Sequence, residues 1–345
     1  MGKRKTRANF SGLSRFVGEL KESQAPVDVE QSTPNPPSTV AGVTRKASEL
    51  QEDQPTESRS KKRKVGLLGP GYEKYDATGL APHYTHISQV PDNLKKYFSQ
   101  RKRYFSLYSE GCLLDEEGWY SVTPELIADQ IAERCRCDTI VDAFCGVGGN
   151  AIAFARTCER VIAIDTSPVR LALARHNATI YGVVDRIEFI LADYISFARS
   201  YLSRPNTGSR KIDAIFLSPP WGGPEYLSGL LPTDTSQADT SSHEAEKHPE
   251  YSLASIKPIH GAELFALSRQ ITPNIAYFLP RNSNLEEISR LLADEKDKSK
   301  SKGKAKAEMI EIEEEWMGTK LKALTCYFGG LAAGQEDLFD ANLTP

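Results

Sequence analysis

The sequence predicts an α/β protein built on a doubly wound, mostly parallel sheet. Two observations lead to this prediction. Short apolar runs rich in Val, Ile, Leu and Phe recur between residues 139 and 327, and each has the length of a buried strand. Helix-like segments rich in Ala and Leu separate runs of this kind. Strands that alternate with helices indicate parallel pairing through crossover helices.

The composition fits a chain that buries a large core and also carries long polar segments. It has 345 residues, 39% of them hydrophobic, and a net charge of −3, so any basic surface must be local. The six cysteines show no paired CxxC spacing, which argues against a zinc site and favours reduced thiols. No apolar run approaches the roughly 20 residues of a membrane span. We therefore expect neither a metal centre nor a membrane segment.

The amino-terminal tail differs sharply from the rest. Residues 1–65 are rich in Ser, Pro, Gln, Thr and charged residues, with few aromatic ones. Such a composition cannot bury enough apolar surface to fold, so we expect this tail to be disordered. It ends in a compact basic cluster, Lys61-Lys62-Arg63-Lys64, which is typical of a nuclear-import signal. An ordinary solvated run of charge is the alternative interpretation.

Residues 66–121 interleave aromatic residues with cations. Examples are Lys95-Lys96-Tyr97-Phe98 and Arg101-Lys102-Arg103-Tyr104-Phe105. The aromatic rings could form a small core past which the cations reach solvent. Alternatively, the segment could be a lid whose cations meet phosphate groups. Its place just ahead of the predicted sheet favours a small helical accessory lobe that does both.

Residues 122–335 contain the predicted sheet. A first helix starts at Thr123-Pro124, with Thr123 as the N-cap, and Ser167-Pro168 starts a later one. Two polar stretches, near 233–250 and 294–306, interrupt the pattern, and we expect flexible insertions there. The predicted strands lie, in order, at 139–143, 160–165, 186–190, 212–217, 274–279, 309–313 and 321–327.

The turn after the first predicted strand carries a nucleotide-binding pattern. Gly146-x-Gly148-x-x-Ala151 follows that strand, and Asp165 ends the next one, where an acid suits a ribose diol. Asp142 ends the first strand, directly before the turn. Its charge would repel a pyrophosphate but attract the ammonium group of a methionine moiety. The pattern therefore favours S-adenosylmethionine over NAD.

Asp193 follows the third predicted strand, directly after Ala192. The carboxyl ends of parallel strands meet at one edge of a sheet, so Asp193 is placed to meet the amine of an adenine there. A purely structural alternative is that Asp193 caps the next helix, which is a common role for Asp.

The fourth predicted strand ends abruptly at Ser218-Pro219-Pro220-Trp221-Gly222-Gly223-Pro224. Proline offers no N–H group to a sheet and fixes φ, so the strand cannot continue. The hydroxyl and carbonyl oxygens around Ser218 then form an edge rich in hydrogen-bond acceptors, which we call the acceptor lip. Such an edge is suited to binding the hydrogens of a planar NH2 group beside the ring of Trp221. The alternative is a strand stopped by prolines and followed by a tryptophan that belongs to the core.

Several segments between about residues 70 and 330 resemble the trimethylguanosine synthase family, whose members are RNA cap hypermethylases with a class I, Rossmann-like methyltransferase fold. Shorter matches occur at 96–97, 118–124 and 321–329. The tail and the two polar insertions depart from the compact family core, which leaves partner binding and regulation open. The strongest matches are Val141-Asp142-Ala143-Phe144-Cys145-Gly146-Val147-Gly148-Gly149-Asn150, Ser218-Pro219-Pro220-Trp221-Gly222-Gly223-Pro224 and Tyr277-Phe278-Leu279-Pro280-Arg281-Asn282.

The resemblance implies a role for each matching residue. Trp221 would stack on the 7-methylguanine of the cap, while Ser218 and Pro219 would hold its exocyclic N2. The cap phosphates would meet Lys96, Tyr226 and Arg281. The residues implied to bind S-adenosylmethionine are Asp142, Asp165 and Asp193, together with Tyr120, Thr123, Phe144 and Gly146.

The resemblance implies an enzyme that methylates N2 of the 7-methylguanosine cap of small nuclear and nucleolar RNAs, giving 2,2,7-trimethylguanosine. Ribonucleoprotein proteins could recruit it, and we expect it in the nucleus, in the nucleolus or a related nuclear body. One alternative is an amino-methyltransferase for an internal adenine or guanine of RNA or DNA. The sequence Trp221-Gly222-Gly223, in place of a lone Tyr or Phe, argues against it. The other alternative is a catalytically silent cap-binding module. The presence of Asp142, Asp165 and Ser218 argues against it.

Overall fold

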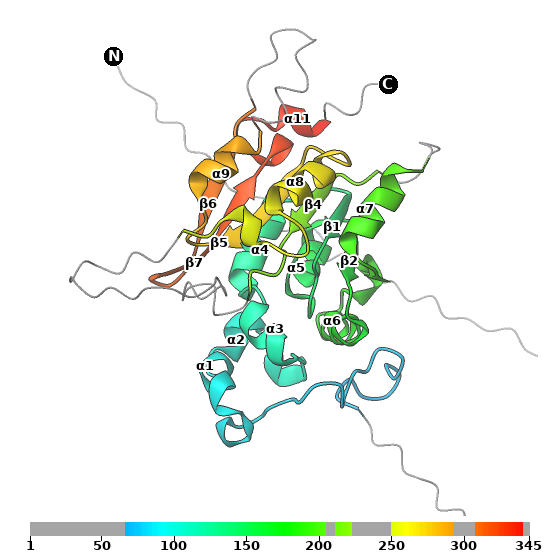
Figure 1. The fold of residues 1–345 in the computed structure, drawn as a ribbon. Helices are drawn as coiled ribbons and strands as arrows, with labels where there is room; N and C mark the ends of the chain where they lie inside the picture. Colours follow the sequence, from blue (N-terminus) through cyan, green and yellow to red (C-terminus); the bar gives the residue numbers. More distant parts are fainter. Residues whose placement is uncertain (1–65, 205–210, 223–249, 293–307, 341–345) are drawn as a thin grey trace, which may run out of the picture. The chain divides into compact units, whose positions relative to one another are not determined.

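The centre of the molecule is one seven-stranded sheet. The computed structural model describes residues 66–204, 211–222, 250–292 and 308–340. The strand order is β3-β2-β1-β4-β5-β7-β6. Strands β1 to β5 pair in parallel, and β7 is antiparallel to both β5 and β6. The strands are β1 (Thr139–Asp142), β2 (Arg160–Asp165), β3 (Ile187–Leu191), β4 (Ala214–Leu217), β5 (Ile275–Pro280), β6 (Glu311–Met317) and β7 (Lys320–Tyr327). The predicted mostly parallel, seven-stranded α/β fold is confirmed (Figure 1).

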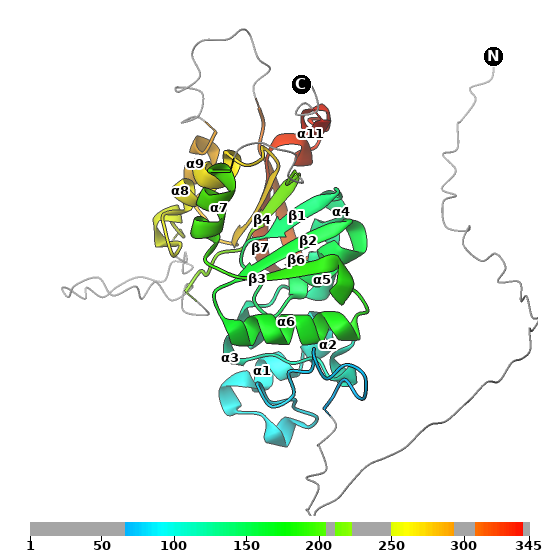
Figure 2. The same ribbon diagram turned by 90° about the vertical axis from the view of Figure 1, so that its right-hand side faces the viewer.

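Helices cover both faces of this sheet (Figure 2). Ile140 of β1 packs into one apolar cluster and Val141 into another, and Phe216 and Leu217 of β4 divide in the same way. Because successive strand residues point to opposite faces, each face has its own core. Helices α4 (Glu125–Arg134), α5 (Gly149–Thr157) and α6 (Pro168–Ile180) serve the first cluster, and α7 (Tyr194–Leu202), α8 (Gly261–Arg269) and α9 (Leu285–Arg290) serve the second.

Short elements complete the described chain. The N-terminal part contains η1 (Ile87–Gln89), η2 (Asp92–Leu94), α1 (Lys95–Phe98), α2 (Arg101–Tyr104), η3 (Tyr108–Glu110) and α3 (Glu116–Ser121). Further short elements are η4 (Val184–Arg186), η6 (Leu253–Ser255), η7 (Gly329–Leu331) and α11 (Asp337–Asp340). Within the described ranges, no helix is long and apolar enough to cross a membrane, and no group of His, Cys, Asp or Glu is arranged to hold a metal ion. The predicted tail at 1–65 lies outside the described residues, as do the predicted insertions apart from Glu250.

Two local predictions were wrong. The sixth strand was expected at 309–313 but runs from Glu311 to Met317. Its Glu-rich sequence lacks the apolar pattern of a buried strand, because a strand at the edge of a sheet tolerates charge that a buried strand does not. Thr123 was expected to cap α4, but the N-cap is Pro124 and no side chain caps the helix. The Thr123 hydroxyl is buried and instead accepts a hydrogen bond from Nδ2 of Asn150, 2.9 Å away.

The segment at 66–121 is organised by aromatic packing. The rings of Phe98 and Trp119 lie 6.2 Å apart, and Tyr108 lies 5.6 Å from Trp119. All three side chains are buried. The guanidinium group of Arg101 lies over the Phe98 ring, 4.2 Å from its centre. This part of the segment therefore has the expected small aromatic core with a cation against it.

Two buried polar side chains of α6 connect this segment to the part of the chain that forms the sheet. His176 accepts a hydrogen bond from the Ala77 backbone N–H through Nδ1 at 3.1 Å, and its Nε2 lies 3.0 Å from the Gly111 carbonyl oxygen. Asn177 accepts from the Leu113 N–H at 2.8 Å and donates to the carbonyl of Leu113 at 2.9 Å. Asn177 also donates to the carbonyl of Val147, in the turn after β1, at 2.9 Å. One amide thus joins the N-terminal segment to that turn.

Replacing Asn177 tests this connection. Asn177→Ala would leave three buried backbone groups without a partner. We therefore expect the free energy of unfolding to fall by about 2–4 kcal/mol. Thr179→Ala, on the same helix, removes only a bond to the Arg175 carbonyl and should change stability by about 0.5 kcal/mol or less. Urea unfolding of both variants measures the difference. Equal stability of the two would show that Asn177 does not connect the parts.

Candidate functional site

The polar residues singled out in the sequence gather at one edge of the sheet. Asp142 ends β1, Asp165 ends β2 and Asp193 follows β3, while Ser218 follows β4 and Arg281 follows β5. These five strands are parallel, so their carboxyl ends share an edge. From β1 and β4, which are neighbours, the chain order runs outward in both directions. In open α/β sheets, ligands bind at such a point of reversal.

The turn after β1 leaves room at this edge. Gly146 and Gly148 have φ angles of 52° and 93°, in the left-handed region that favours glycine. A Cβ atom on Gly148 would lie 3.1 Å from the Ala174 Cα, so this glycine permits close packing on α6. A Cβ atom on Gly146 would meet nothing within 4 Å. Gly146 therefore borders open space that a ligand could occupy.

Asp142 is the most unusual residue of the site. Its side chain is fully buried, and neither carboxyl oxygen has a hydrogen-bond partner in the described part of the chain. The backbone N–H groups of Phe144 and Ala151 lie near enough to lower its pKa, yet neither makes a hydrogen bond of good geometry. Burial, followed by the negative charge of Asp165, raises the pKa of Asp142 from 3.8 to about 7. A cation placed here would reverse this shift.

Asp165 is already hydrogen-bonded but not saturated. Its Oδ2 accepts from the Gly146 N–H at 3.0 Å, and its Oδ1 accepts from the Ser167 N–H at 2.7 Å. These two bonds fix the carboxylate beside the glycine turn. Each carboxylate oxygen has two lone pairs, so each retains one for a further donor such as a ribose hydroxyl.

Asp193 does cap a helix, as the structural alternative proposed. Its Oδ2 accepts from the backbone N–H and from the hydroxyl of Ser196, both at 2.9 Å, at the start of α7. Its other oxygen makes no hydrogen bond within the described ranges. Capping therefore uses one oxygen and leaves the second available for an amine.

The remaining residues predicted for a cofactor differ in how exposed they are. Phe144 is half-buried, and its ring lies 5.9 Å from that of Tyr194. Tyr120, on α3, is 37% exposed, and its ring lies 6.3 Å from that of Tyr97. Thr123 is buried against Asn150 of α5, so it supports the glycine turn from behind.

Trp221 is held from two sides. Its ring lies 5.2 Å from that of Phe278, at an angle of 33°. Its backbone carbonyl accepts a hydrogen bond from the Tyr251 hydroxyl at 3.3 Å. Ser218 and Trp221 are half-buried, and Pro219 is buried. The residues thus form a lip whose tryptophan is partly accessible and backed by Phe278.

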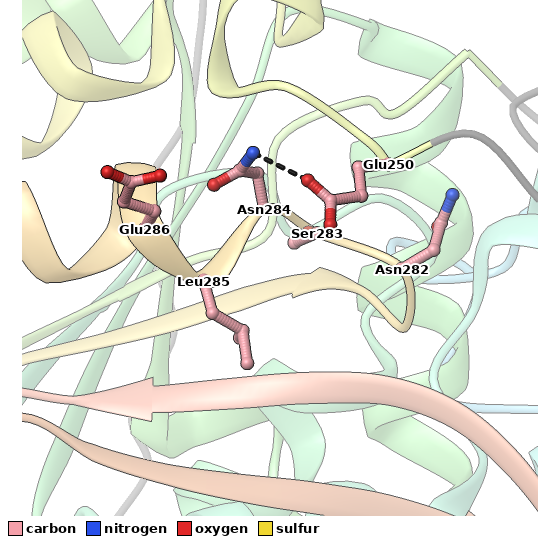
Figure 3. A pocket seen from close by; sticks show the side chains of 6 residues that line it. All are labelled: Glu250, Asn282, Ser283, Asn284, Leu285 and Glu286. Carbon is pink, nitrogen blue, oxygen red and sulfur yellow. Dashed lines mark hydrogen bonds between the residues drawn. The ribbon is translucent and has the colours of Figure 1, made fainter.

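Sequence reasoning missed Tyr251. Its backbone bonds to Asn282 and Asn284, at 2.8 and 2.9 Å, in the loop after β5. The adjacent Glu250 accepts from Nδ2 of Asn284 at 2.7 Å, beside a hollow lined by Glu250 and residues 282–286 (Figure 3). Tyr251 thereby connects this loop to Trp221. No local pattern marks it, because it follows a polar stretch and its partners are distant in sequence.

The cations predicted to meet phosphates lie on different elements. Lys96 is exposed on α1, with its ammonium group 4.7 Å from the centre of the Tyr97 ring. Arg281 is half-buried and donates from Nη1 to the Leu321 carbonyl at 3.4 Å. Within the described ranges, no hydrogen bond or ion pair joins these two side chains. Tyr226 lies outside the described residues.

The burial of Asp142 predicts a pH effect on stability. Its pKa is raised in the folded protein. Its contribution to stability is therefore fully present below pH 3.8, the ordinary pKa of this carboxyl, and is lost as the pH rises through about 7. The loss can reach roughly 4 kcal/mol by that shift. Asp142→Asn should remove this part of the pH dependence in urea unfolding of the ligand-free protein. Asp138→Asn, an exposed change just before the same strand, should leave it unchanged. Parallel profiles for the parent and Asp142→Asn would contradict this account.

Comparison with known proteins identifies the matching family and two similar proteins. A family described as RNA cap guanine-N2 methyltransferase matches residues 137–230 and 243–331, more than half of the chain. A Schizosaccharomyces pombe protein named trimethylguanosine synthase is 37% identical over 228 residues, which cover 63% of this chain and 83% of that protein. A Saccharomyces cerevisiae protein of the same name is 34% identical over 203 residues, covering 57% of this chain and 58% of that protein.

Proposed function

This chain belongs to the RNA cap guanine-N2 methyltransferase family, and we propose that it uses S-adenosylmethionine to methylate N2 of the 7-methylguanosine cap of small nuclear and nucleolar RNAs. One observation carries the proposal. Asp142 and Phe216 are register partners on the adjacent strands β1 and β4, so the unpartnered carboxyl lies beside the strand that ends in Ser218-Pro219. A group that attracts a cation and a group that accepts from an amine are thereby neighbours.

For the cofactor, we assign S-adenosylmethionine to the cradle around the glycine turn, where it would supply an electrophilic methyl group. Asp142 would pair with the ammonium group of its methionine moiety, which supplies the missing partner. Asp165 would accept from the ribose hydroxyls, and Asp193 from the adenine amine through Oδ1. The open space beside Gly146 suits a close approach of the ligand to the backbone. Tyr120, Thr123 and Phe144 complete the proposed cradle.

For the cap, we assign the base to the exposed side of Trp221. N7-methylguanine is cationic, so a cation–π attraction of about 0.5–2 kcal/mol adds to stacking on this ring. Phe278 would support the ring from the other side. Plain guanine lacks the charge, which would give a preference for caps already methylated at N7.

For the reaction, the Ser218 hydroxyl and the Pro219 carbonyl would orient N2. Its lone pair is delocalised into the ring, so N2 is a poor nucleophile and alignment with the methyl group is the main requirement. Alignment can contribute several kcal/mol, up to about 7–11 in the best intramolecular cases. The N2 proton would leave to solvent after transfer. A second round on the same nitrogen gives the dimethylated product.

For the phosphates and the surrounding lobe, we propose that Lys96, Tyr226 and Arg281 meet the triphosphate bridge. Residues 66–121 would form the accessory lobe that closes over both ligands, ahead of a methyltransferase domain at 122–335. The basic cluster at 61–64 supports import into the nucleus. We place the enzyme there, in the nucleolus or a related body, where ribonucleoprotein proteins could bring it to its RNA.

The function is tested with the purified full chain and S-adenosylmethionine. We expect 7-methyl-GTP to gain one and then two methyl groups at N2, and GTP to react far more slowly. Mass spectrometry detects the added groups, and the same assay on an uncapped RNA, followed by nuclease digestion, shows whether internal amines are methylated. Equal rates on the two nucleotides would contradict recognition of the cationic base, and methylation of internal RNA amines alone would favour the amino-methyltransferase alternative.

Replacing Trp221 separates stacking from a structural role. Activity on 7-methyl-GTP should fall from Trp221 to Trp221→Phe to Trp221→Ala, because loss of a stacking platform costs roughly 1–3 kcal/mol. The affinity for S-adenosylmethionine should stay near that of the parent, since the aspartates of the cradle are untouched. A tryptophan with only a structural role predicts a lower melting temperature and weaker binding of both ligands. Calorimetric titration and thermal unfolding distinguish these results.

A further inference from the structure

Two cysteine sulfurs are in contact at the edge of the sheet opposite the candidate site. Cys137 lies just before β1, and Cys158 lies between α5 and β2, where it is the C-cap of that helix. Their Sγ atoms are 3.9 Å apart. Strands β1 and β2 are parallel and begin at this edge, whereas Asp142 and Asp165 lie where the same strands end. The pair is therefore remote from the site described above.

This contact distinguishes the pair from the other cysteines. All six cysteines lie in the described part of the chain, and all are free thiols. Within that part, the other four make no hydrogen bond to a second sulfur. Cys112 and Cys145, for example, donate to backbone carbonyls instead. Two adjacent thiols are thus a feature of this one place in the described fold.

The backbone already holds the two cysteines side by side. The register of β1 and β2 pairs Thr139 with Arg160. Followed back along both strands, it places Cys137 opposite Cys158. The Cys137 carbonyl accepts from the Glu159 N–H at 3.4 Å, and the next carbonyl accepts from the Arg160 N–H at 2.9 Å, which supports this continuation. Adjacent strands lie about 4.8 Å apart, within the range of about 4.4–6.8 Å over which disulfides join Cα atoms. Rotation of the side chains can therefore bring the sulfurs into bonding distance without a shift of either strand.

The surroundings of the pair favour the loss of one proton. The S–H group of one cysteine can donate to the other sulfur, which lowers the pKa of Cys158. The Thr157 hydroxyl, 3.7 Å from the same sulfur, and the charge of Arg136 also lower this pKa, while burial opposes them. A thiolate is the form of cysteine that attacks an oxidant. Cys137 is half-buried, so a small oxidant can reach the pair from its side.

A bond between these sulfurs would close a loop that carries part of the candidate site. Residues 137–158 contain β1, the glycine turn and α5. They include Asp142, whose buried carboxyl has no partner in the described chain and so weakens the ligand-free fold. A disulfide stabilises a fold mainly by restricting the unfolded chain, and it does so appreciably for a loop of about 20 residues. A disulfide here would therefore offset part of the cost of burying that carboxyl.

We propose that Cys137 and Cys158 form a site of reversible oxidation, where a peroxide joins the two thiols in a disulfide that ties the start of β1 to the end of α5. The thiolate of one cysteine attacks an oxygen of hydrogen peroxide, the O–O bond breaks, and the leaving oxygen takes up a proton to become water. The second sulfur attacks the resulting sulfenic acid, the S–O bond breaks, and the oxygen leaves as water with the second thiol's proton. Two thiols are oxidised and one peroxide is reduced. Neither step involves S-adenosylmethionine or RNA, so this property is independent of the proposed function.

The test uses the purified full chain, first reduced and then treated with hydrogen peroxide. Remaining thiols are alkylated in denaturant, and mass spectrometry of tryptic peptides finds any linked pair. The variants are Cys137→Ser and Cys158→Ser, with Cys135→Ser as the matched control. Cys135 is buried, and its backbone carbonyl, which the substitution keeps, accepts from the Cys158 sulfur at 3.4 Å. The variants identify the sulfurs involved, because Cys137 and Cys145 share one tryptic peptide.

We expect the oxidised parent to lose two alkylatable thiols and the mass of two hydrogens, and to yield a peptide that links Cys137 to Cys158. Dithiothreitol should restore both thiols. Oxidation should raise the melting temperature of the parent by about 5–10 °C. Cys135→Ser should show the same link and the same rise, and Cys137→Ser and Cys158→Ser should show neither. Each variant is compared with its own reduced form, so a change in stability caused by the substitution itself cancels.

Other results would overturn the proposal. A link from either residue to a different cysteine, or between two chains, would assign the reactive sulfurs elsewhere. Addition of oxygen to Cys137 without a link would show that the buried sulfur does not reach it. A link with an unchanged or lower melting temperature would contradict the stabilising role. The half-buried Cys137→Ser, which should fold normally, keeps the test decisive even if the buried Cys158→Ser does not fold.

Discussion

The buried carboxyl of Asp142 is the constraint on which the rest of the site depends. A carboxyl taken out of water without a hydrogen-bond partner is costly, and the cost is largest when it is ionised. The protein holds Asp142 at the end of the central strand β1, against the glycine turn, with both oxygens unsatisfied within the described chain. Such an arrangement persists when a ligand supplies the missing charge. The open space beside Gly146 and the remaining lone pairs of Asp165 indicate where such a ligand can lie.

The second half of the site follows from the sheet topology. Because β4 is the neighbour of β1, the chain that leaves β4 at Ser218 emerges beside Asp142. The two prolines stop the strand there, and their missing N–H groups leave carbonyl oxygens as the local polar groups. Phe278 on β5 and the hydroxyl of Tyr251 then hold Trp221. Three adjacent strands thus bring a carboxyl group, an acceptor lip and an aromatic ring together.

Much of this arrangement could be predicted from the sequence, because buried strands have clear apolar patterns and their ends determine the site edge. β2 was predicted to the residue, since its run of Val, Ile and Ala is bounded by charge. The predicted position of the edge strand β6 was wrong by a few residues, because its Glu-rich face has no apolar pattern. Tyr251 and the pairing of Thr123 with Asn150 depend on contacts between distant segments. No local pattern encodes such contacts.

The contacts of α6 couple the N-terminal segment to the turn beside Asp142. Asn177 bonds to Leu113 of the N-terminal segment and to Val147 of the glycine turn through one amide group. A displacement of the N-terminal segment would therefore strain the turn that borders Asp142, unless this buried hydrogen bond were broken. The same segment carries Tyr120 and Lys96, which we assign to the cofactor and to the cap phosphates. The shared amide of Asn177 therefore holds the N-terminal segment in place beside the glycine turn before any ligand binds.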